Sequence, residues 1–150
     1  MATFDTVLPA IMEHFVQQIA STTPVGSKMH KWKRWTAEPM LEDEGSRDRL
    51  FDVYVDQNTP IELVTFGSTT NDYNVPVNID ICYHETRYQT AIGLRDFDVI
   101  QRQIMNSDTS ALTGYNFARF ESYEWLTTGE QDTEYRFLRI PVMVRVSVST

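Results

Sequence analysis

Three side chains that ligate metals or act as nucleophiles and bases, those of Asp80, Cys82 and His84, alternate along one predicted strand. Side chains two residues apart in a strand point to the same face of the sheet, so all three could approach one ion or one substrate. A structural zinc site uses four ligands, however, and Cys82 is the single cysteine of the chain. A cysteine nucleophile needs a histidine that takes its proton, and His84 lies beside Cys82 rather than over its thiol. We therefore interpret the three residues as the polar face of a strand.

Other signatures of enzymes and cofactor sites are absent from the sequence. It has no G-x-S-x-G elbow, no phosphate-binding loop of the Walker type and no G-x-G-x-x-G turn. Its 21 acidic residues are scattered, and no pair of them stands out as a general acid and base. The sequence therefore predicts a protein that is not an enzyme and that has no catalytic residues, cofactor or metal.

A segment near residue 30 combines basic and aromatic side chains and then reverses its charge. The candidate partner interface consists of Lys28, Lys31, Trp32, Lys33, Arg34 and Trp35, followed by Glu42, Asp43 and Glu44. Basic and aromatic residues together suit single-stranded nucleic acid, but tryptophan and arginine also anchor protein interfaces. In a third interpretation, the tryptophans complete the core beneath a solvated loop. The net charge of −8 disfavours nucleic acid.

Length and composition indicate one domain over residues 1–150. The single cysteine excludes a disulfide within the chain. No apolar run approaches the roughly 20 residues of a membrane-spanning helix, and the N-terminus lacks the pattern of a signal peptide. We therefore predict a soluble, unprocessed protein that does not contact a membrane.

Apolar residues at helical spacing predict two helices. The stripe of the first helix consists of Phe4, Leu8, Ile11, Phe15 and Ile19. We expect Thr6 to be its N-cap, which places Pro9 in the first turn, where a missing N–H costs nothing. The second helix is predicted over residues 94–105, with Asp96 and Asp98 in its first turn, where acidic residues suit the helix dipole.

Strict alternation of apolar and polar residues predicts strands over residues 51–55 and 75–83, and the second of these should be central in a sheet. Residues 61–66 are expected to pair back on the first strand. The stretch of residues 27–49 has no clear periodicity, which is typical of a functional or a disordered segment rather than a plain connection. It is predicted to be an extended arm or loop, with one short strand near Trp32.

The last third of the chain alternates over residues 118–126 and again over residues 134–148, which predicts a long hairpin. Pro141 cannot donate to a ladder, so the last strand should be an edge there or carry a bulge. The order of the elements predicts an α+β fold, with a mainly antiparallel sheet, two helices packed on one face and a long C-terminal β-hairpin. An exposed edge of such a sheet favours pairing with another chain.

This arrangement resembles the tail terminator (tail completion) proteins of bacteriophages with long non-contractile tails. Three segments carry the resemblance, and together they span most of the chain. They are the first helix (residues 7–19), the strand of residues 77–83 that leads to the helix of residues 94–105, and the terminal strand (residues 135–146). The likeness is one of element order and pattern.

The resemblance implies a structural virion protein of the tail or neck, present in the host cytoplasm during assembly. It implies a homohexameric ring that ends polymerisation of the tail tube and contacts the tail tube protein and a neck or head-completion protein. DNA would pass through the ring without specific binding, which suits an acidic chain because a negative lumen repels phosphates. The alternatives are a head-completion (stopper) protein and a nucleic-acid-binding module that uses Trp32 and Trp35.

The opposite charges within residues 28–44 suit the contact between adjacent subunits of a ring. Reversing Lys31, Lys33 and Arg34 to glutamate should therefore weaken the ring and lower its mass in light scattering. An unchanged mass would contradict a role of these cations in assembly.

Overall fold

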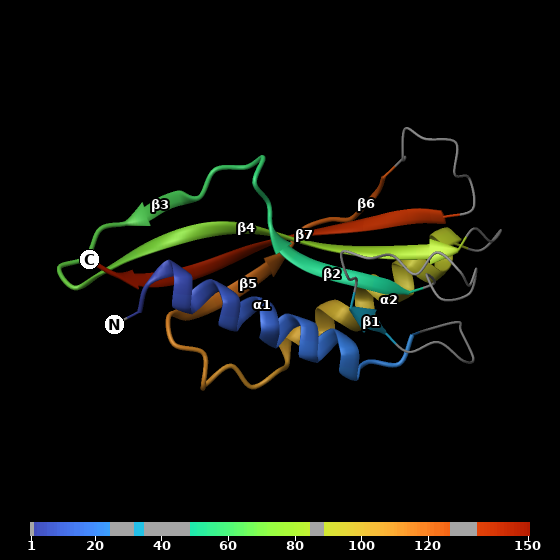
Figure 1. The fold of residues 1–150 in the computed structure, drawn as a ribbon, viewed down its shortest axis with the longest axis horizontal. Coiled ribbons are helices and arrows are strands. Elements are labelled where there is room, and N and C mark those ends of the chain that lie inside the picture. The colour runs from blue at the N-terminus through green and yellow to red at the C-terminus, as the bar shows by residue number, and fades with distance from the viewer. Residues whose placement is uncertain (1, 25–31, 35–48, 85–88, 127–134) are drawn as a thin grey trace.

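The structure is a computed structural model that describes residues 2–24, 32–34, 49–84, 89–126 and 135–150 (Figure 1). These residues form two helices, α1 (Phe4–Ser21) and α2 (Gln89–Met105). Their strands are β1 (Lys33–Arg34), β2 (Leu50–Val55), β3 (Glu62–Thr65), β4 (Thr70–His84), β5 (Tyr115–Phe120), β6 (Glu124–Leu126) and β7 (Tyr135–Ser149). Strand β1 confirms the short strand expected near Trp32. Most of the arm predicted over residues 27–49 lies outside the described residues.

The strands form one sheet in the order β1-β2-β4-β7-β5, with β3 also beside β4 and β6 also beside β7. Every pairing is antiparallel except that of β1 with β2. The two helices lie against one face of the sheet, where α1 contacts α2, β2 and β7 (Figure 1). The predicted α+β fold with a mainly antiparallel sheet is therefore confirmed.

Strands β4 and β7, of 15 residues each, pair along their whole length, from Thr70 opposite Ser149 to His84 opposite Tyr135. The predicted alternation is present in both strands, and one set of side chains from each is buried against the helices. This set comprises Val75, Val77, Ile79, Ile81 and Tyr83 of β4, and Leu138, Ile140, Val142, Val144, Val146 and Val148 of β7. Strand β4 is central, as predicted, because β7 flanks one side and β2 and β3 the other.

The prediction that residues 61–66 pair back on the preceding strand is wrong. Strand β3 pairs with β4 instead, with Glu62 opposite Asn74 and Leu63 opposite Tyr73. The reason is the length of β4, because β2 pairs only as far as Val77 and leaves the same edge of β4 free beyond it.

The first half of the closing hairpin is interrupted, since residues 118–126 contribute to two strands, β5 and β6, rather than one. Both pair with β7, which confirms the hairpin. Strand β5 pairs with β7 as far as Val142, and β6 begins at Arg139. Pro141 lies at the gap between them, so β7 is a local edge at its proline, as predicted.

Both helices begin earlier than predicted. Helix α1 starts at Phe4 with Thr3 as its N-cap, because the hydroxyl of Thr6 accepts a hydrogen bond from the backbone N–H of Thr3 at 3.1 Å. Pro9 therefore lies inside the helix, on its exposed side. Helix α2 starts at Gln89, which moves Asp96 out of the first turn. Neither described helix has the length and apolar character that crossing a membrane requires.

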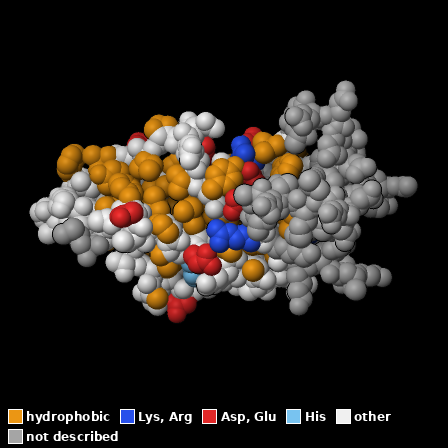
Figure 2. Space-filling view, viewed as in Figure 1, with side chains coloured by type: hydrophobic (Ala, Val, Ile, Leu, Met, Phe, Trp, Pro, Cys, Tyr) orange, Lys and Arg blue, Asp and Glu red, His pale blue; other side chains and the backbone are white. Residues whose placement is uncertain are grey.

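Residues 61–66, which we name the β3 segment, expose large apolar side chains. The exposed fractions are 41% for Ile61, 39% for Leu63, 41% for Val64 and 79% for Phe66. Figure 2 shows hydrophobic side chains gathered on the part of the molecule where β3 lies in Figure 1. A contiguous group of this kind on one edge of a sheet is typical of an interaction surface.

A fully buried ion pair connects the start of β2 to helix α2. The Nε atom of Arg49 lies 2.8 Å from Oδ2 of Asp96, and the two side chains are 4% and 0% exposed. The hydroxyl of Tyr83 donates to the same carboxylate at 2.7 Å, and the Arg49 guanidinium lies 4.5 Å from the centre of the Tyr83 ring. Arg49 has a positive φ of 64°, which places its side chain for these contacts at a cost in backbone energy.

Replacing Asp96 by asparagine should destabilise the fold by about 3–5 kcal/mol, because it breaks a buried ion pair by removing the carboxylate that lies 2.8 Å from the Arg49 guanidinium. The free energy of unfolding in guanidinium chloride measures this loss. Arg102→Ala is the matched control, because it removes an exposed pair with Asp98 on the same helix. The control should cost no more than about 0.5 kcal/mol. Equal losses in the two variants would show that the buried pair has no special importance.

Candidate functional site

The face of the sheet that points away from the helices carries most of the polar side chains of the central strands. We name it the polar face, and its central residues are Asp52 and Tyr54 of β2, Asn78 and Asp80 of β4, and Arg139 and Arg145 of β7. The register confirms that they share a face, since Asp52 lies opposite Asp80, Tyr54 opposite Asn78, and Asp80 opposite Arg139. These cross-strand neighbours are close enough to interact directly.

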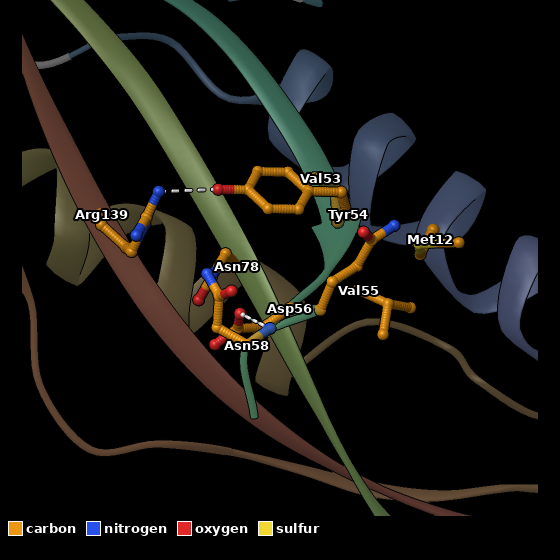
Figure 3. A pocket seen from close by; sticks show the side chains of 9 residues that line it. Met12, Val53, Tyr54, Val55, Asp56, Asn58, Asn78 and Arg139 are labelled. Carbon is orange, nitrogen blue, oxygen red and sulfur yellow. Dashed lines mark hydrogen bonds between the residues drawn. The ribbon is translucent and has the colours of Figure 1, made fainter. Parts of the chain in front are cut away.

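A pocket of about 460 Å³ opens where β2 meets the polar face (Figure 3). Its polar lining consists of Tyr54, Asp56, Gln57, Asn58, Asn78 and Arg139, and Met12, Val53 and Val55 add apolar surface. Asp56 accepts hydrogen bonds from the backbone N–H of Asn58 and the hydroxyl of Thr59, both at 2.9 Å. These bonds lower the pKa of Asp56, so its carboxylate stays ionised and holds the turn after β2 in place.

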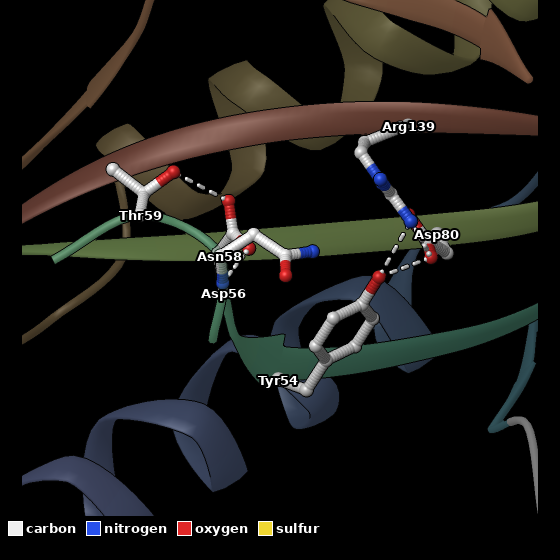
Figure 4. Close-up of polar contacts among 6 residues, drawn as sticks. All are labelled: Tyr54, Asp56, Asn58, Thr59, Asp80 and Arg139. Carbon is white, nitrogen blue, oxygen red and sulfur yellow. Dashed lines mark hydrogen bonds and ion pairs between the residues drawn. The ribbon is translucent and has the colours of Figure 1, made fainter.

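Asp80, Arg139 and Tyr54 form a closed network beside this pocket (Figure 4). Arg139 binds the Asp80 carboxylate through Nε at 2.9 Å and through Nη2 at 3.1 Å. The Tyr54 hydroxyl donates to Asp80 at 2.5 Å and accepts from Nη2 of Arg139 at 2.8 Å. The two hydrogen bonds between Arg139 and Asp80, together with those of Tyr54, connect the three neighbouring strands β2, β4 and β7. They also occupy the polar atoms of these side chains that a ligand would otherwise bind.

The protonation states of the network follow from its geometry. Burial, and then the hydrogen bond to Asp80, raise the pKa of Tyr54 to about 12. The hydrogen bonds that Arg139 donates to the Asp80 carboxylate raise the pKa of Arg139 further above its ordinary value. At neutral pH the tyrosine is therefore a donor and the arginine a cation, and neither acts as a base. The network has the chemistry of a structural cross-link.

Asp52 is a carboxylate of the polar face whose partly buried negative charge has no close cation beside it among the described residues, since Arg34 is 3.9 Å away. Burial raises its pKa, although the backbone N–H of Val53 at 2.9 Å and Arg34 act against this shift. Arg34 is distant, with 3.9 Å between its Nε atom and Oδ1 of Asp52. The Asp80 carboxylate across the strand pair also raises the pKa of Asp52. Ionisation of Asp52 is therefore less favourable in the folded protein than in the unfolded chain.

The structure separates the residues of the predicted partner interface. Trp32 is 4% exposed and packs edge-on against Phe51, with ring centres 6.0 Å apart, so it belongs to the core. Its indole is therefore not available in this chain to stack on a base or to anchor a partner. Arg34 pairs with Glu13 of the same chain at 3.2 Å. The side chain of Lys33 and the remaining predicted residues, Lys28, Lys31, Trp35, Glu42, Asp43 and Glu44, lie outside the described part.

Asp80 and Cys82 do not meet at one point of the polar face. Asp80 binds Arg139 and Tyr54, whereas Cys82 is 1% exposed and packs with Leu50 and Phe137. The side chain of His84 lies outside the described residues. Within the ranges that the structure describes, no three His, Cys, Asp or Glu side chains are grouped to hold a metal ion.

The sequence analysis missed the β3 segment as a candidate site. The signal was present, because Leu63 and Val64 are adjacent apolar residues and Ile61 and Phe66 extend the run on both sides. A strand with apolar side chains on both faces is usually buried, and here it lies at an edge. Of the surfaces described, this segment has the composition of a contact with another protein.

No protein-family model matches the chain, and no curated protein matches it. The fold and the surfaces define an α+β protein with two helices on one face of its sheet and an apolar edge segment.

Replacing Asp52 by asparagine should raise Tm at pH 7. A carboxyl group whose pKa is raised by folding loses stabilising effect as pH rises from its ordinary pKa of 3.8 through the folded value. Asparagine removes this loss and keeps an oxygen that accepts from Val53. The gain in Tm over the natural protein should therefore shrink to nothing at pH 3.

Asp56→Asn is the matched control on the same strand end, because the pKa of Asp56 is lowered by its hydrogen bonds. Its ionised form contributes stability above pH 3.8 that is lost on acidification, so this variant should lower Tm at pH 7. A fall in Tm for both variants would contradict the assignment of Asp52.

Proposed function

We propose that this chain is a structural virion protein that forms a ring at the head-proximal end of a phage tail tube. The ring ends polymerisation of the tube and joins the tail to the neck, and its subunits number six. Its partners are further copies of the chain, the tail tube protein and a neck or head-completion protein. It acts through interfaces and catalyses no reaction.

The order of elements supports this proposal. The three segments that resemble tail terminator proteins correspond to α1, to β4 leading into α2, and to β7. Strands β4 and β7 lie side by side at the centre of the sheet, and α1 and α2 contact one another. The resemblance therefore extends to elements that form one continuous core.

The observation that carries the proposal is the exposure of the β3 segment. Four large apolar side chains in six consecutive residues are between 39% and 79% exposed. Covering such a patch with another protein surface removes it from water, at a gain of about 25 cal/mol per Å² of apolar area. A protein that works by assembly needs a surface of this kind.

The charge of the chain supports a role around DNA without binding it. A net charge of −8 opposes tight contact with the phosphate backbone, which requires a basic footprint. The burial of Trp32 counts against the nucleic-acid-binding alternative, because that alternative needs its indole as a stacking surface.

The native mass of the purified chain tests the proposal. A six-membered ring should have a mass of about 104 kDa, six times the 17.4 kDa of one chain, in light scattering or native mass spectrometry. Electron microscopy should show particles with a central hole. A monomer at all concentrations up to about 1 mM, well above common interface affinities, would overturn the proposal.

A further inference from the structure

Strand β3 has one paired side and one free side. Its inner side pairs with β4, where Glu62 lies opposite Asn74 and Leu63 opposite Tyr73. On its outer side no strand of the described residues pairs with it, and all four of its residues are exposed. Its backbone N–H and C=O groups on that side are available to a further strand.

The opposite edge of the same part of the sheet is β5. Strand β4 pairs with β3 over residues 72–74 and with β7 throughout, and β7 pairs with β5 over residues 142–146. Four strands therefore lie side by side in the order β3-β4-β7-β5. Strand β5 also exposes a large apolar side chain, Phe117, which is 46% exposed with the Arg145 guanidinium 5.3 Å from its ring centre.

The directions of the two edge strands are compatible with pairing between copies. Each of the three pairings from β3 to β5 is antiparallel, so β3 runs antiparallel to β5. A rotation about an axis parallel to the strands keeps their directions. A second copy placed in this way would present its β5 antiparallel to β3 of the first copy, and the sheet would continue without a change of pattern.

The charges of the edge strands select a register. Glu62 is the one charged residue of β3, and Arg119 is the one charged residue of β5, where its exposed side chain also pairs with Glu121 of the same chain at 2.6 Å. Both lie on the polar face, since Glu62 is opposite Asn74 and Arg119 is opposite Met143. Opposite charges in directly opposed positions stabilise a strand pair, and like charges in such positions destabilise it.

The remaining residues fit the same register. With Glu62 opposite Arg119, Leu63 falls opposite Ala118, and both of these point to the helix side. The irregularity of β3 between Leu63 and Thr65 then returns Thr65 to the polar face, where Phe117 lies. The three opposed pairs of this register, Glu62 with Arg119, Leu63 with Ala118 and Thr65 with Phe117, therefore each lie on one face of the sheet.

We propose that β3 of one copy pairs with β5 of the next copy, in the register that sets Glu62 opposite Arg119. This pairing rests on the proposed function, because it specifies the contact by which the ring is built. The contact is head-to-tail, since it uses two different edges. Such contacts close into a ring when the rotation between neighbouring copies is a whole-number fraction of 360°.

Cysteine cross-linking tests the pairing. In the variant Glu62→Cys with Arg119→Cys, a mild oxidant should link neighbouring copies through disulfides. A denaturing gel should then show a ladder of bands from the dimer up to the complete ring. Glu62→Cys alone and Arg119→Cys alone should give no covalent product. The natural Cys82 is 1% exposed and stays unreactive. Leu94→Cys with Met105→Cys is the control, because both positions are exposed on α2 and away from the two edges.

A dimer from Glu62→Cys alone would overturn the proposal, because it would show that β3 pairs with β3. A ring in native mass measurements without a ladder in the double variant would also overturn it, while leaving self-association intact. A monomer that forms no ladder would overturn both the pairing and the proposed function.

Charge exchange gives a second measurement that does not depend on oxidation. Glu62→Arg and Arg119→Glu should each raise the chain concentration at which half of the rings have assembled by about tenfold. The double exchange should restore the concentration of the natural protein. Far-ultraviolet circular dichroism should be unchanged in all three variants. Failure of the double exchange to restore association in folded protein would contradict the register.

Discussion

The pairing of β4 with β7 is the interaction on which the rest of the structure depends. It runs through 15 residues of each strand, and it sets which side chains of both strands face the helices. Strands β2 and β3 are held by β4, and β5 and β6 by β7, so no other described strand except β1 attaches elsewhere. The core of α1 and α2 is then assembled on one face of this pair. Both the polar face and the two edges are consequences of it.

Two ionic contacts secure this framework at different depths. Asp80 and Arg139 are partly exposed and join the central strands across the polar face, with Tyr54 attached to both. Arg49 and Asp96 are buried, and they tie the sheet to α2. A buried pair is costly to form and costlier to break, so it contributes specificity of arrangement more than net stability. Together these contacts leave the protein with few uncommitted charges at the centre of the sheet.

The sequence predicted the elements that local pattern determines. Alternation along β4 and β7 and the helical stripe of α1 gave the fold class, because burial on one face leaves a periodic record. It did not predict that residues 61–66 would join β4, since strand partners depend on lengths and registers that no local pattern encodes. Asp96 and Arg49 are likewise far apart in sequence, and the pair forms only when α2 meets the sheet. The residues around Trp32 in the sequence were compatible with a place in the core or at an interface, and the structure shows that Trp32 is buried in the core.

The register of β7 constrains how this protein can change. Even-numbered residues from Leu138 to Val148 face the helices, and odd-numbered residues such as Arg139 and Arg145 face the other way. Losing or gaining one residue inside the strand would exchange the two sets beyond that point and bring guanidinium groups into the core. Substitutions at the odd positions have no such effect. The number of residues within the strand is therefore constrained, and an odd position is constrained only where its side chain makes contacts on the polar face, as that of Arg139 does with Asp80 and Tyr54.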